Sequence, residues 1–459
     1  MRLSKFSEKY KNKSFSLFLK SITVLSIFPI VFYFIAGYFS GFGFYIVNSE
    51  LILDSQNISI YNLFLGLLIP TIILLSSIIS GLNRKIISQI FPLITNFTIY
   101  GLLVYLAIAI LSFVFCLFLF LNEIAGLIVI YILIGVGFSL SLFYVFPPIF
   151  NGVLNFSKIN YIPVVGVTLD DKNHSEIFTL VRNLAKNIKT KEPKNIVVSL
   201  TTDFYAISKD LKIFNGLDEK IINNETLHIS LPLLKILTVK EVSGIIGHEL
   251  GHFEGKDTDY ALKFAPIYRR LNKQFEELED FFLEEENQKT KSFFIKLAVY
   301  PIIFLFNEFS RKAEKISKEQ ELKADKFGAK ASDGAKIFIT ALSKIYIYDL
   351  IWNETKENFR EMVKEKKIKN LSANFFEEAK KLLDNKNLIN YLKGMQYYEQ
   401  LHPSDTHPSL EQRINNLDIK LDDISNNDLI NYNPSASSLI KNINIIEQNL
   451  TSLAIQLEK

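Results

Sequence analysis

Two histidines four residues apart, His248 and His252, enclose an acid in the run His-Glu-Leu-Gly-His. Val239 and Ile246 precede this run at helical spacing, which predicts that it lies on an amphipathic helix. Residues four apart share one face of a helix, so both imidazoles can reach a single metal ion. Glu249 lies one position from the first histidine and can act as a general base on a metal-activated water without binding the metal. The run therefore predicts a hydrolytic zinc site.

The alternative for this run is a surface helix whose two histidines are solvated. The chain has only 6 histidines among 459 residues, so a chance occurrence of this spacing is uncommon. Gly251, inside the run, lowers helix stability by about 1 kcal/mol relative to alanine. Its presence predicts close packing at that position against another element or against substrate.

Zinc needs a third protein ligand, and a second helical segment, Ser317–Asp325, offers one. Glu321 and Asp325 are four residues apart and share a helix face. Glu321 would complete a His-His-Glu site, while Asp325 would hydrogen-bond a ligating histidine and fix its tautomer. Other acids, Glu314 and Glu319, stand nearby among the lysines, and spacing alone does not choose among them.

The two segments together resemble the HtpX-type membrane zinc metallopeptidases, a family that also includes the CAAX prenyl proteases and the mitochondrial Oma-type enzymes. The second motif of that family reads roughly S-R-x-x-E-x-x-A-D, and Ser317, Glu321, Ala324 and Asp325 match it. The resemblance implies that Glu321 is the third zinc ligand and that Asp325 supports a histidine. Lys318 stands where the family usually has arginine, which keeps the charge but loses bidentate pairing.

A third match, Thr406–Ile414, is similar to the family's late T-H-P-x-x-x-x-R-I element. The resemblance assigns His407 a catalytic role, as a hydrogen-bond donor to the oxyanion of the tetrahedral intermediate. Considered on its chemistry alone, His407 is a turn histidine before a proline, and His402 is a rival for the same role. Arg413 is predicted to be a structural partner of buried carboxylates.

Composition and charge limit the partners of the chain. Lys and Arg number 51 against 48 Asp and Glu, and the net charge of +3 favours neither nucleic acid nor an acidic partner. The single cysteine, Cys116, excludes an intrachain disulfide and a cysteine-based metal site. The composition is 49% hydrophobic, and the apolar excess lies in the first third of the chain. The lipid bilayer is therefore an expected partner, and the family resemblance implies membrane-protein or peptide substrates; the sequence does not give the oligomeric state.

Four apolar runs are each long enough to cross a bilayer, which takes about 20 residues. The loop after the second run carries Arg84 and Lys85, and the N-terminal segment is also basic, whereas the segments 48–60 and 122–123 carry no Lys or Arg. This bias predicts a multi-pass protein of the inner or plasma membrane with both termini and the catalytic domain in the cytoplasm. The four runs fall near Ile22–Val47, Tyr61–Ser80, Phe97–Leu121 and Ile124–Phe146.

The predicted domains are a transmembrane domain at 1–150, a zinc metallopeptidase domain at 151–415 and a docked C-terminal helical extension at 416–459. The predicted fold class is an α-helical membrane domain plus an α+β zincin-like domain, mostly helical, with a small sheet beside the metal-binding helix. A helix is predicted at 174–188 and the last helix from Leu439 to Leu453. The strands of the small sheet are predicted at 195–200, 203–208 and 226–230. A small sheet beside the metal-binding helix suits a protease that binds its peptide as an added edge strand.

The sequence leaves more than one role possible for two segments. The apolar stretch 293–306 has about 14 residues with Lys296 and Pro301 inside, which is short for a span, and it is expected to be a core or interfacial helix. The charged segment 353–400 is expected to cover the cleft, with binding of anionic lipid headgroups as the alternative.

The sequence thus predicts a membrane-anchored endopeptidase with one zinc per chain. The resemblance implies misfolded or damaged membrane proteins as substrates. A CAAX-type processing protease is one alternative, which the count of four spans disfavours. A catalytically silent scaffold with a structural zinc is the other, and Glu249 speaks against it because a structural site needs no base.

Overall fold

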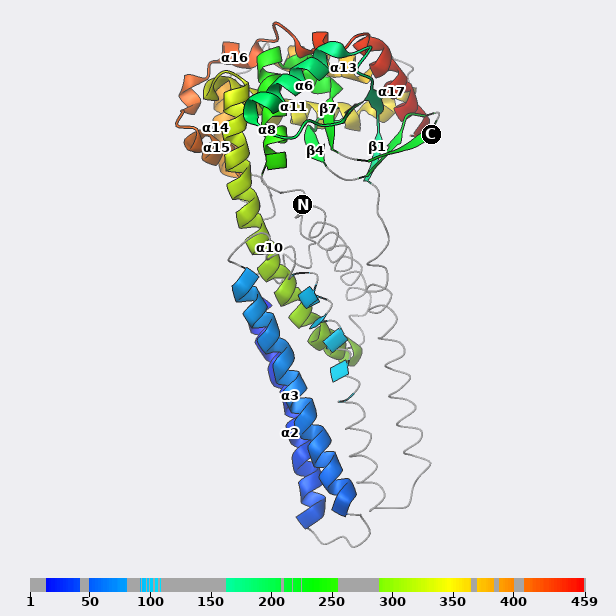
Figure 1. Ribbon diagram of the computed structural model, residues 1–459, viewed down its shortest axis with the longest axis vertical. Coiled ribbons are helices and arrows are strands. Elements are labelled where there is room, and N and C mark those ends of the chain that lie inside the picture. Colours follow the sequence, from blue (N-terminus) through cyan, green and yellow to red (C-terminus); the bar gives the residue numbers. More distant parts are fainter. Residues whose placement is uncertain are drawn as a thin grey trace. The chain divides into compact units, whose positions relative to one another are not determined.

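The structure is a computed structural model of the chain, shown in Figure 1. It describes residues 14–41, 49–80, part of 91–108, 162–254 except 208, 209, 217 and 224, and then 289–364, 370–383, 388–399 and 408–457. The chain divides into two compact units. The first unit comprises residues 1–158 and 260–314, and the second comprises residues 159–259 and 315–459.

The first unit is helical in its described part. Helix α2 (Ser14–Gly41) packs along α3 (Ser49–Ser80), and α10 (Lys289–Ala331) contributes its residues up to Glu314. Among the described residues, Leu53–Ile79 is the one stretch long and apolar enough to cross a bilayer. Most of the apolar run at 97–121 and all of the run at 124–146 lie outside the described residues.

The prediction of a loop at 48–60, between the first two apolar runs, was wrong. Helix α3 begins at Ser49 and includes this polar stretch. The polar side chains find partners inside the helix pair, because the Ser59 hydroxyl donates to the Ser55 carbonyl (2.9 Å) and Gln56 reaches the carbonyl of Tyr33 on α2 (3.5 Å). Satisfied in this way, the polar residues do not interrupt the helix.

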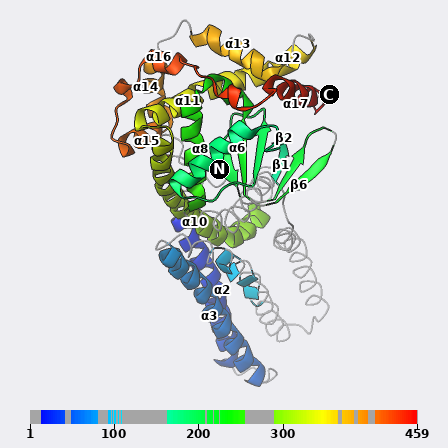
Figure 2. The same ribbon diagram turned by 45° about the horizontal axis from the view of Figure 1, so that its top comes forward.

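The second unit contains two small sheets beside helices, so the fold is mostly helical with small sheets, as the sequence predicts. The first sheet has the order β1-β5-β6, with β1 parallel to β5 and β5 antiparallel to β6. The second has the order β2-β3-β7-β4, in which β3 and β7 are parallel and β4 runs antiparallel to β7 at the edge. Figure 2 shows the strands of both sheets next to one another. The strands are β1 (Ile162–Val165), β2 (Val167–Leu169), β3 (Asn195–Ser199), β4 (Tyr205–Ile207), β5 (Leu211–Phe214), β6 (Glu219–Ile222) and β7 (Thr226–Ser230).

The predicted helix at 174–188 and the strands at 195–200 and 226–230 are confirmed by α6, β3 and β7, while the strand expected at 203–208 is shorter. Helix α6 buries Ile177, Val181, Leu184 and Ile188, the periodic face that predicted it. Besides the end of α10, the helices in the described part of this unit are α6 (Ser175–Ile188), α7 (Leu231–Ile236), α8 (Val239–Glu254), α11 (Ala335–Glu357), α12 (Phe359–Lys364), α13 (Leu371–Leu383), α14 (Leu388–Glu399), α15 (Leu410–Asn416), α16 (Asn426–Ile430) and α17 (Ile443–Leu457), with short 3-10 turns at η2 (Leu421–Asp423) and η3 (Ala436–Leu439).

The C-terminal segment belongs to the same hydrophobic core as the sheet and α8. Leu429, Leu450 and Leu453 are buried in that core. The last helix begins at Ile443 rather than at Leu439, which lies in η3 instead. The residues expected on one helix face thus pack from two elements separated by a turn with positive φ at Asn442.

Helices α8 and α10 approach each other closely along a line of glycines. A β-carbon on Gly247 would lie 2.3 Å from the β-carbon of Ala331, and one on Gly251 would lie 2.8 Å from the Phe327 ring. The close packing predicted at Gly251 is confirmed. Since a real β-carbon does not fit at these distances, glycine is what allows the two backbones to come together.

We expect Gly247→Ala to destabilise the protein by about 1–3 kcal/mol, because the added methyl forces the two helices apart. The measurement is the free energy of unfolding of the purified chain. Gly394→Ala on α14 is the matched control, since nothing lies within 4 Å of its β-carbon position. The control should be neutral or stabilising by up to about 1 kcal/mol, owing to the better helix propensity of alanine. Equal effects of the two substitutions would contradict the close packing.

Candidate metal centre

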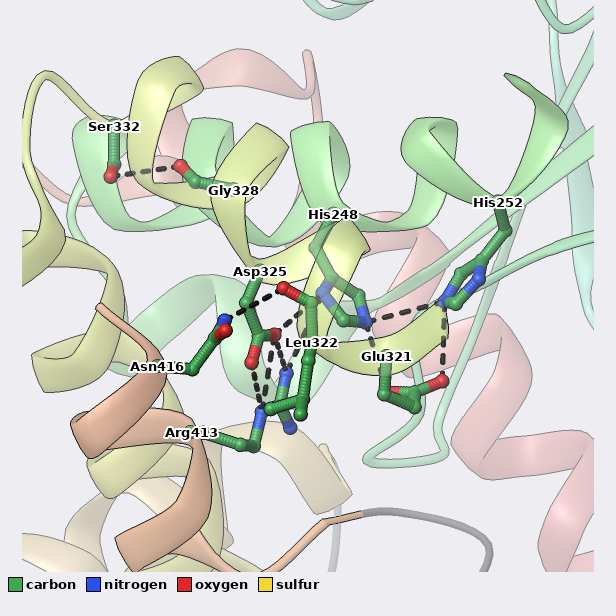
Figure 3. A network of polar contacts seen from close by, with 9 residues as sticks. All are labelled: His248, His252, Glu321, Leu322, Asp325, Gly328, Ser332, Arg413 and Asn416. Carbon is green, nitrogen blue, oxygen red and sulfur yellow. Dashed lines mark hydrogen bonds and ion pairs between the residues drawn. The ribbon is translucent and has the colours of Figure 1, made fainter. Parts of the chain in front are cut away.

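Two helices bring three potential metal ligands together. His248 and His252 lie one turn apart on α8, and Glu321 lies on the part of α10 that belongs to the second unit. The Nε2 atoms of the two histidines are 3.3 Å apart, and each is 3.3 Å from a different oxygen of Glu321. Figure 3 shows the two rings and the carboxylate pointing toward one another. All three donor atoms lie within 4.8 Å of one another.

The donor distances fit a tetrahedral metal ion. Ligands about 2.0–2.1 Å from a tetrahedral centre are about 3.3 Å from each other. The two Nε2 atoms have this separation, and each Nε2 has it from the carboxylate oxygen that faces it. The donor set of two imidazoles and one carboxylate leaves the fourth position for water or substrate. The residues therefore fit a catalytic divalent metal.

Asp325 orients the first histidine. Its Oδ1 lies 3.0 Å from His248 Nδ1, and both side chains are buried. An ionised carboxylate only accepts hydrogen bonds, so Nδ1 carries the proton and Nε2 presents its lone pair toward His252 and Glu321. The structure thus places Asp325 in contact with the histidine that it was expected to support.

Arg413 in turn holds Asp325. Its Nε lies 3.1 and 3.0 Å from the two carboxylate oxygens, and its Nη2 also donates to Oδ1. The guanidinium is buried and lies 5.9 Å from the centre of the Phe338 ring. Arg413 is therefore the partner of a buried carboxylate, as expected from the sequence, and it pairs with the acid that supports the metal site.

Helix α15, which carries Arg413, is fixed at both ends. At its start the Ser409 hydroxyl accepts from the Gln412 amide (3.2 Å), and the Gln412 side chain accepts from the Ser409 amide (3.1 Å). At its end Asn416 donates to the Leu322 carbonyl on α10 (2.7 Å). These contacts place α15 against the helix of the third ligand (Figure 3).

The electrostatics of the site favour a cation. Burial alone would lower the pKa of His248, but the hydrogen bonds to Asp325 and Glu321 outweigh burial and the pKa is raised. Burial would raise the pKa of Asp325, yet the hydrogen bond with His248 and the charge of Arg413 hold it below its ordinary value. The same negative potential that retains a proton on the imidazole also attracts a divalent metal.

The remaining predicted residues differ in how far the structure describes them. Glu249 lies on α8 with a half-buried side chain, next to His248. Glu319 is exposed whereas Glu321 is buried, so the structure chooses between these two acids. Lys318 is half-buried. His407, the proposed oxyanion donor, lies outside the described residues, as does its rival His402.

Sequence reasoning missed a buried ion pair at the start of α8. Lys344, on α11, is fully buried and lies 2.8 Å from Glu241. The sequence signal was a lysine within the apolar stretch Ala341–Tyr348, where a lysine requires a partner. The identity of that partner follows only from the fold.

The comparison with protein families shows which family the chain belongs to. The model described as Peptidase family M48 matches residues 171–420, more than half of the chain, and that range contains the three potential ligands, Asp325 and Arg413. The chain belongs to peptidase family M48. The resemblance to HtpX-type zinc metallopeptidases is thereby confirmed.

Curated proteins similar to this M48 member are named as HtpX homologues. The chain is 31% identical over 103 residues to "Protease HtpX homolog 1" of Sulfurisphaera tokodaii, a match that covers 22% of this chain and 30% of that protein. It is 29% identical over 144 residues to "Protease HtpX homolog 1" of Saccharolobus solfataricus, covering 30% and 42% of the two chains. The chain therefore spans less than half the length of the curated relatives it matches. No solved structure matches the chain.

The M48 site yields a direct test of its third ligand. Glu321→Ala should weaken metal binding by more than the about 10- to 100-fold that the loss of an outer partner causes, because it removes a ligand. The metal content of the purified protein, measured by elemental mass spectrometry after dialysis, reports the loss. Glu319→Ala, which changes an exposed acid on the same helix, is the matched control and should keep full metal content. Equal metal content in wild type and Glu321→Ala would overturn the ligand assignment.

Proposed function

We propose that this protein is a membrane-anchored, zinc-dependent endopeptidase. The observation that carries the proposal is the cluster of His248, His252 and Glu321, in which the two Nε2 atoms lie 3.3 Å apart and each lies 3.3 Å from a different oxygen of Glu321. Membership of a peptidase family supports peptide bonds as the substrate. A candidate general base, Glu249, and a candidate oxyanion donor, His407, are also present in the chain.

Zinc is the proposed metal, with one ion per chain. Two imidazoles and one carboxylate form a donor set typical of catalytic zinc sites. Imidazole ligands favour zinc over magnesium or calcium, which prefer all-oxygen sites. When bound, zinc supplies a Lewis acid that polarises the scissile carbonyl and lowers the pKa of water to about 7.

The other steps of the proposed hydrolysis are assigned to side chains of this chain. Glu249 takes a proton from the attacking water and passes it to the leaving amine. Asp325, anchored by Arg413, keeps His248 in the tautomer and orientation that the metal requires. His407 is proposed, from the family resemblance, to donate a hydrogen bond to the developing oxyanion.

The substrate is proposed to bind as an extended strand along β4. This strand is the last in the order β2-β3-β7-β4, and it contacts the metal-binding helix α8. Its backbone pairs with β7 on one side, which leaves the opposite edge as the place for an added strand in the described sheet. Main-chain hydrogen bonds would then hold the peptide independently of its sequence.

The side-chain pattern of α3 supports membrane anchoring. Large apolar residues face outward, with Tyr61, Phe64 and Ile78 about 70% exposed (71%, 69% and 70%), whereas Ser59 and Asn62 are buried. A helix of a water-soluble protein has the opposite pattern. Apolar outside and polar inside is the arrangement expected of a helix that contacts lipid.

We further propose that the protein has four spans, with both termini and the peptidase unit in the cytoplasm, and that it degrades misfolded or damaged membrane proteins. The distribution of Lys and Arg between the loops supports the orientation. The word protease in the names of the relatives supports proteolysis, and the quality-control role rests on the family resemblance.

Glu249→Gln should keep the fold and the metal but lower peptide cleavage by a factor on the order of 10² or more, because the amide cannot accept the proton of the water. Cleavage of a membrane-protein substrate by the purified protein, together with its metal content, is the measurement. Glu319→Gln on α10 makes the same chemical change at an exposed site and should cleave at the wild-type rate. Wild-type cleavage by Glu249→Gln would favour a zinc scaffold without peptidase activity.

The topology is tested with reporters. A reporter fused after Phe156 should score as cytoplasmic and one inserted before Ser49, where α3 begins, as external, because the positive charges lie at the opposite ends of the spans. Alkaline phosphatase and a fluorescent protein give opposite signals in the two compartments. The reversed pattern would place the peptidase unit outside the cell.

A further inference from the structure

The chain beyond the M48 match reaches the base of the metal-binding helix. The match ends at residue 420, and the segment 431–457 follows it. Val239, the first residue of α8, donates its amide to the Pro434 carbonyl (3.1 Å), and Ala436 donates to the Leu237 carbonyl (2.9 Å). The Val239 amide is one of the N-terminal donors that a helix cannot satisfy itself. The later segment therefore supplies an acceptor that α8 lacks.

A buried cation joins the same place. Lys344 is fully buried and donates to Glu241 in the first turn of α8 (2.8 Å) and to the main-chain carbonyl of Asn431. It also lies 3.4 Å from the Ile236 carbonyl, at the end of α7. A buried ammonium needs all such partners, because each one replaces lost water. Lys344 thus ties α7, α8 and the later segment to one point.

A buried carboxylate on α17 makes the second tie. Glu447 is fully buried, lies 3.0 Å from Lys235 on α7, and accepts a hydrogen bond from Asn370 (2.8 Å). One turn later, the Thr451 hydroxyl accepts from the Leu371 amide at the start of α13 (3.0 Å). The C-terminal end of α7, which leads directly into α8, is therefore held by groups that contact residues 431–457.

The ligands lie farther along the same helix. His248 is the tenth residue of α8 and His252 is the fourteenth. Helix α8 is continuous over this length, so a tilt at its base moves both histidines relative to Glu321, which is on a different helix. Contacts of 3.3 Å tolerate little displacement, because metal–ligand distances vary by only about 0.2 Å.

We propose that residues 431–457, the C-terminal brace, fix the base of α8 and thereby hold the metal ligands in register, with Glu447 and Lys344 as positioning residues. The inference rests on the proposed function in so far as it takes His248, His252 and Glu321 to bind zinc. It adds a determinant of metal affinity that lies outside the M48 match. Release of the brace lowers the affinity for zinc, and by reciprocity zinc binding stabilises the brace.

The first test measures the Kd for zinc by competition with a chromophoric chelator, on the full chain in detergent, well below the unfolding temperature. Glu447→Ala should raise the Kd about tenfold, a typical coupling between two sites. Gln448→Ala, an equal truncation at the exposed neighbouring position, should leave the Kd unchanged. Ile222→Ala, in the separate small core cluster, should lower the Tm without changing the Kd. Since Glu447→Ala risks misfolding, Glu447→Gln is the second variant, in which the hydrogen bond with Asn370 remains and the charge pairing with Lys235 is lost.

The second test uses the wild-type chain and needs no variant. Hydrogen exchange of the Val239 and Ala436 amides, which make the two main-chain contacts, is followed with and without zinc. Zinc should slow the exchange of these amides about tenfold, because the coupling that lets the brace strengthen zinc binding also lets zinc stabilise the brace by the same factor. An unchanged Kd in both Glu447 variants, or exchange at these amides that zinc does not alter, would overturn the brace. A wild-type chain that binds no zinc at all would instead overturn the proposed function.

Discussion

The close approach of α8 and α10 is the constraint on which the rest of the site depends. The two histidines and Glu321 come from segments far apart in the sequence, and their donor atoms meet at 3.3 Å. Gly247 and Gly251 let the backbones come this close, because a β-carbon at either position would collide with α10. Gly328 on α10 serves the same purpose toward Phe338, whose ring lies beside both His248 and Arg413. Backbone packing, rather than side-chain flexibility, sets the geometry of the ligands.

Charges are buried around this contact, and each is compensated by a specific partner. Asp325 and Arg413 form a bidentate pair with almost no solvent access, and Lys344 and Glu241 form another at the base of α8. Removing one partner of such a pair leaves a charge in the interior, which costs about 3–5 kcal/mol. The pairs therefore favour one arrangement of α8, α10, α11 and α15 over packings that a purely apolar core would allow.

The sequence was sufficient where a local pattern carried the information. The helical spacing of Val239 and Ile246 predicted α8, and the apolar strands and the face of α6 were found from their own apolar patterns. Spacing could not separate Glu321 from Glu319, because the choice depends on which face of α10 meets α8. The loop expected before Ile60 was wrong, since the partners that satisfy its polar side chains include Tyr33 on another helix. The partner of Lys344 could not be predicted from the sequence for the same reason, because pairings between distant segments depend on the tertiary structure.

The separation of Asp325 and Arg413 in the chain has a consequence for biosynthesis. Arg413 is added 88 residues after Asp325, which takes about 4–18 s at usual translation rates. Until then the nascent chain holds the two histidines and Glu321 without the cation that Asp325 needs in order to be buried beside them. A complete site therefore cannot assemble before the ribosome has added Arg413. Until then the nascent chain is kept from cutting its neighbours or itself.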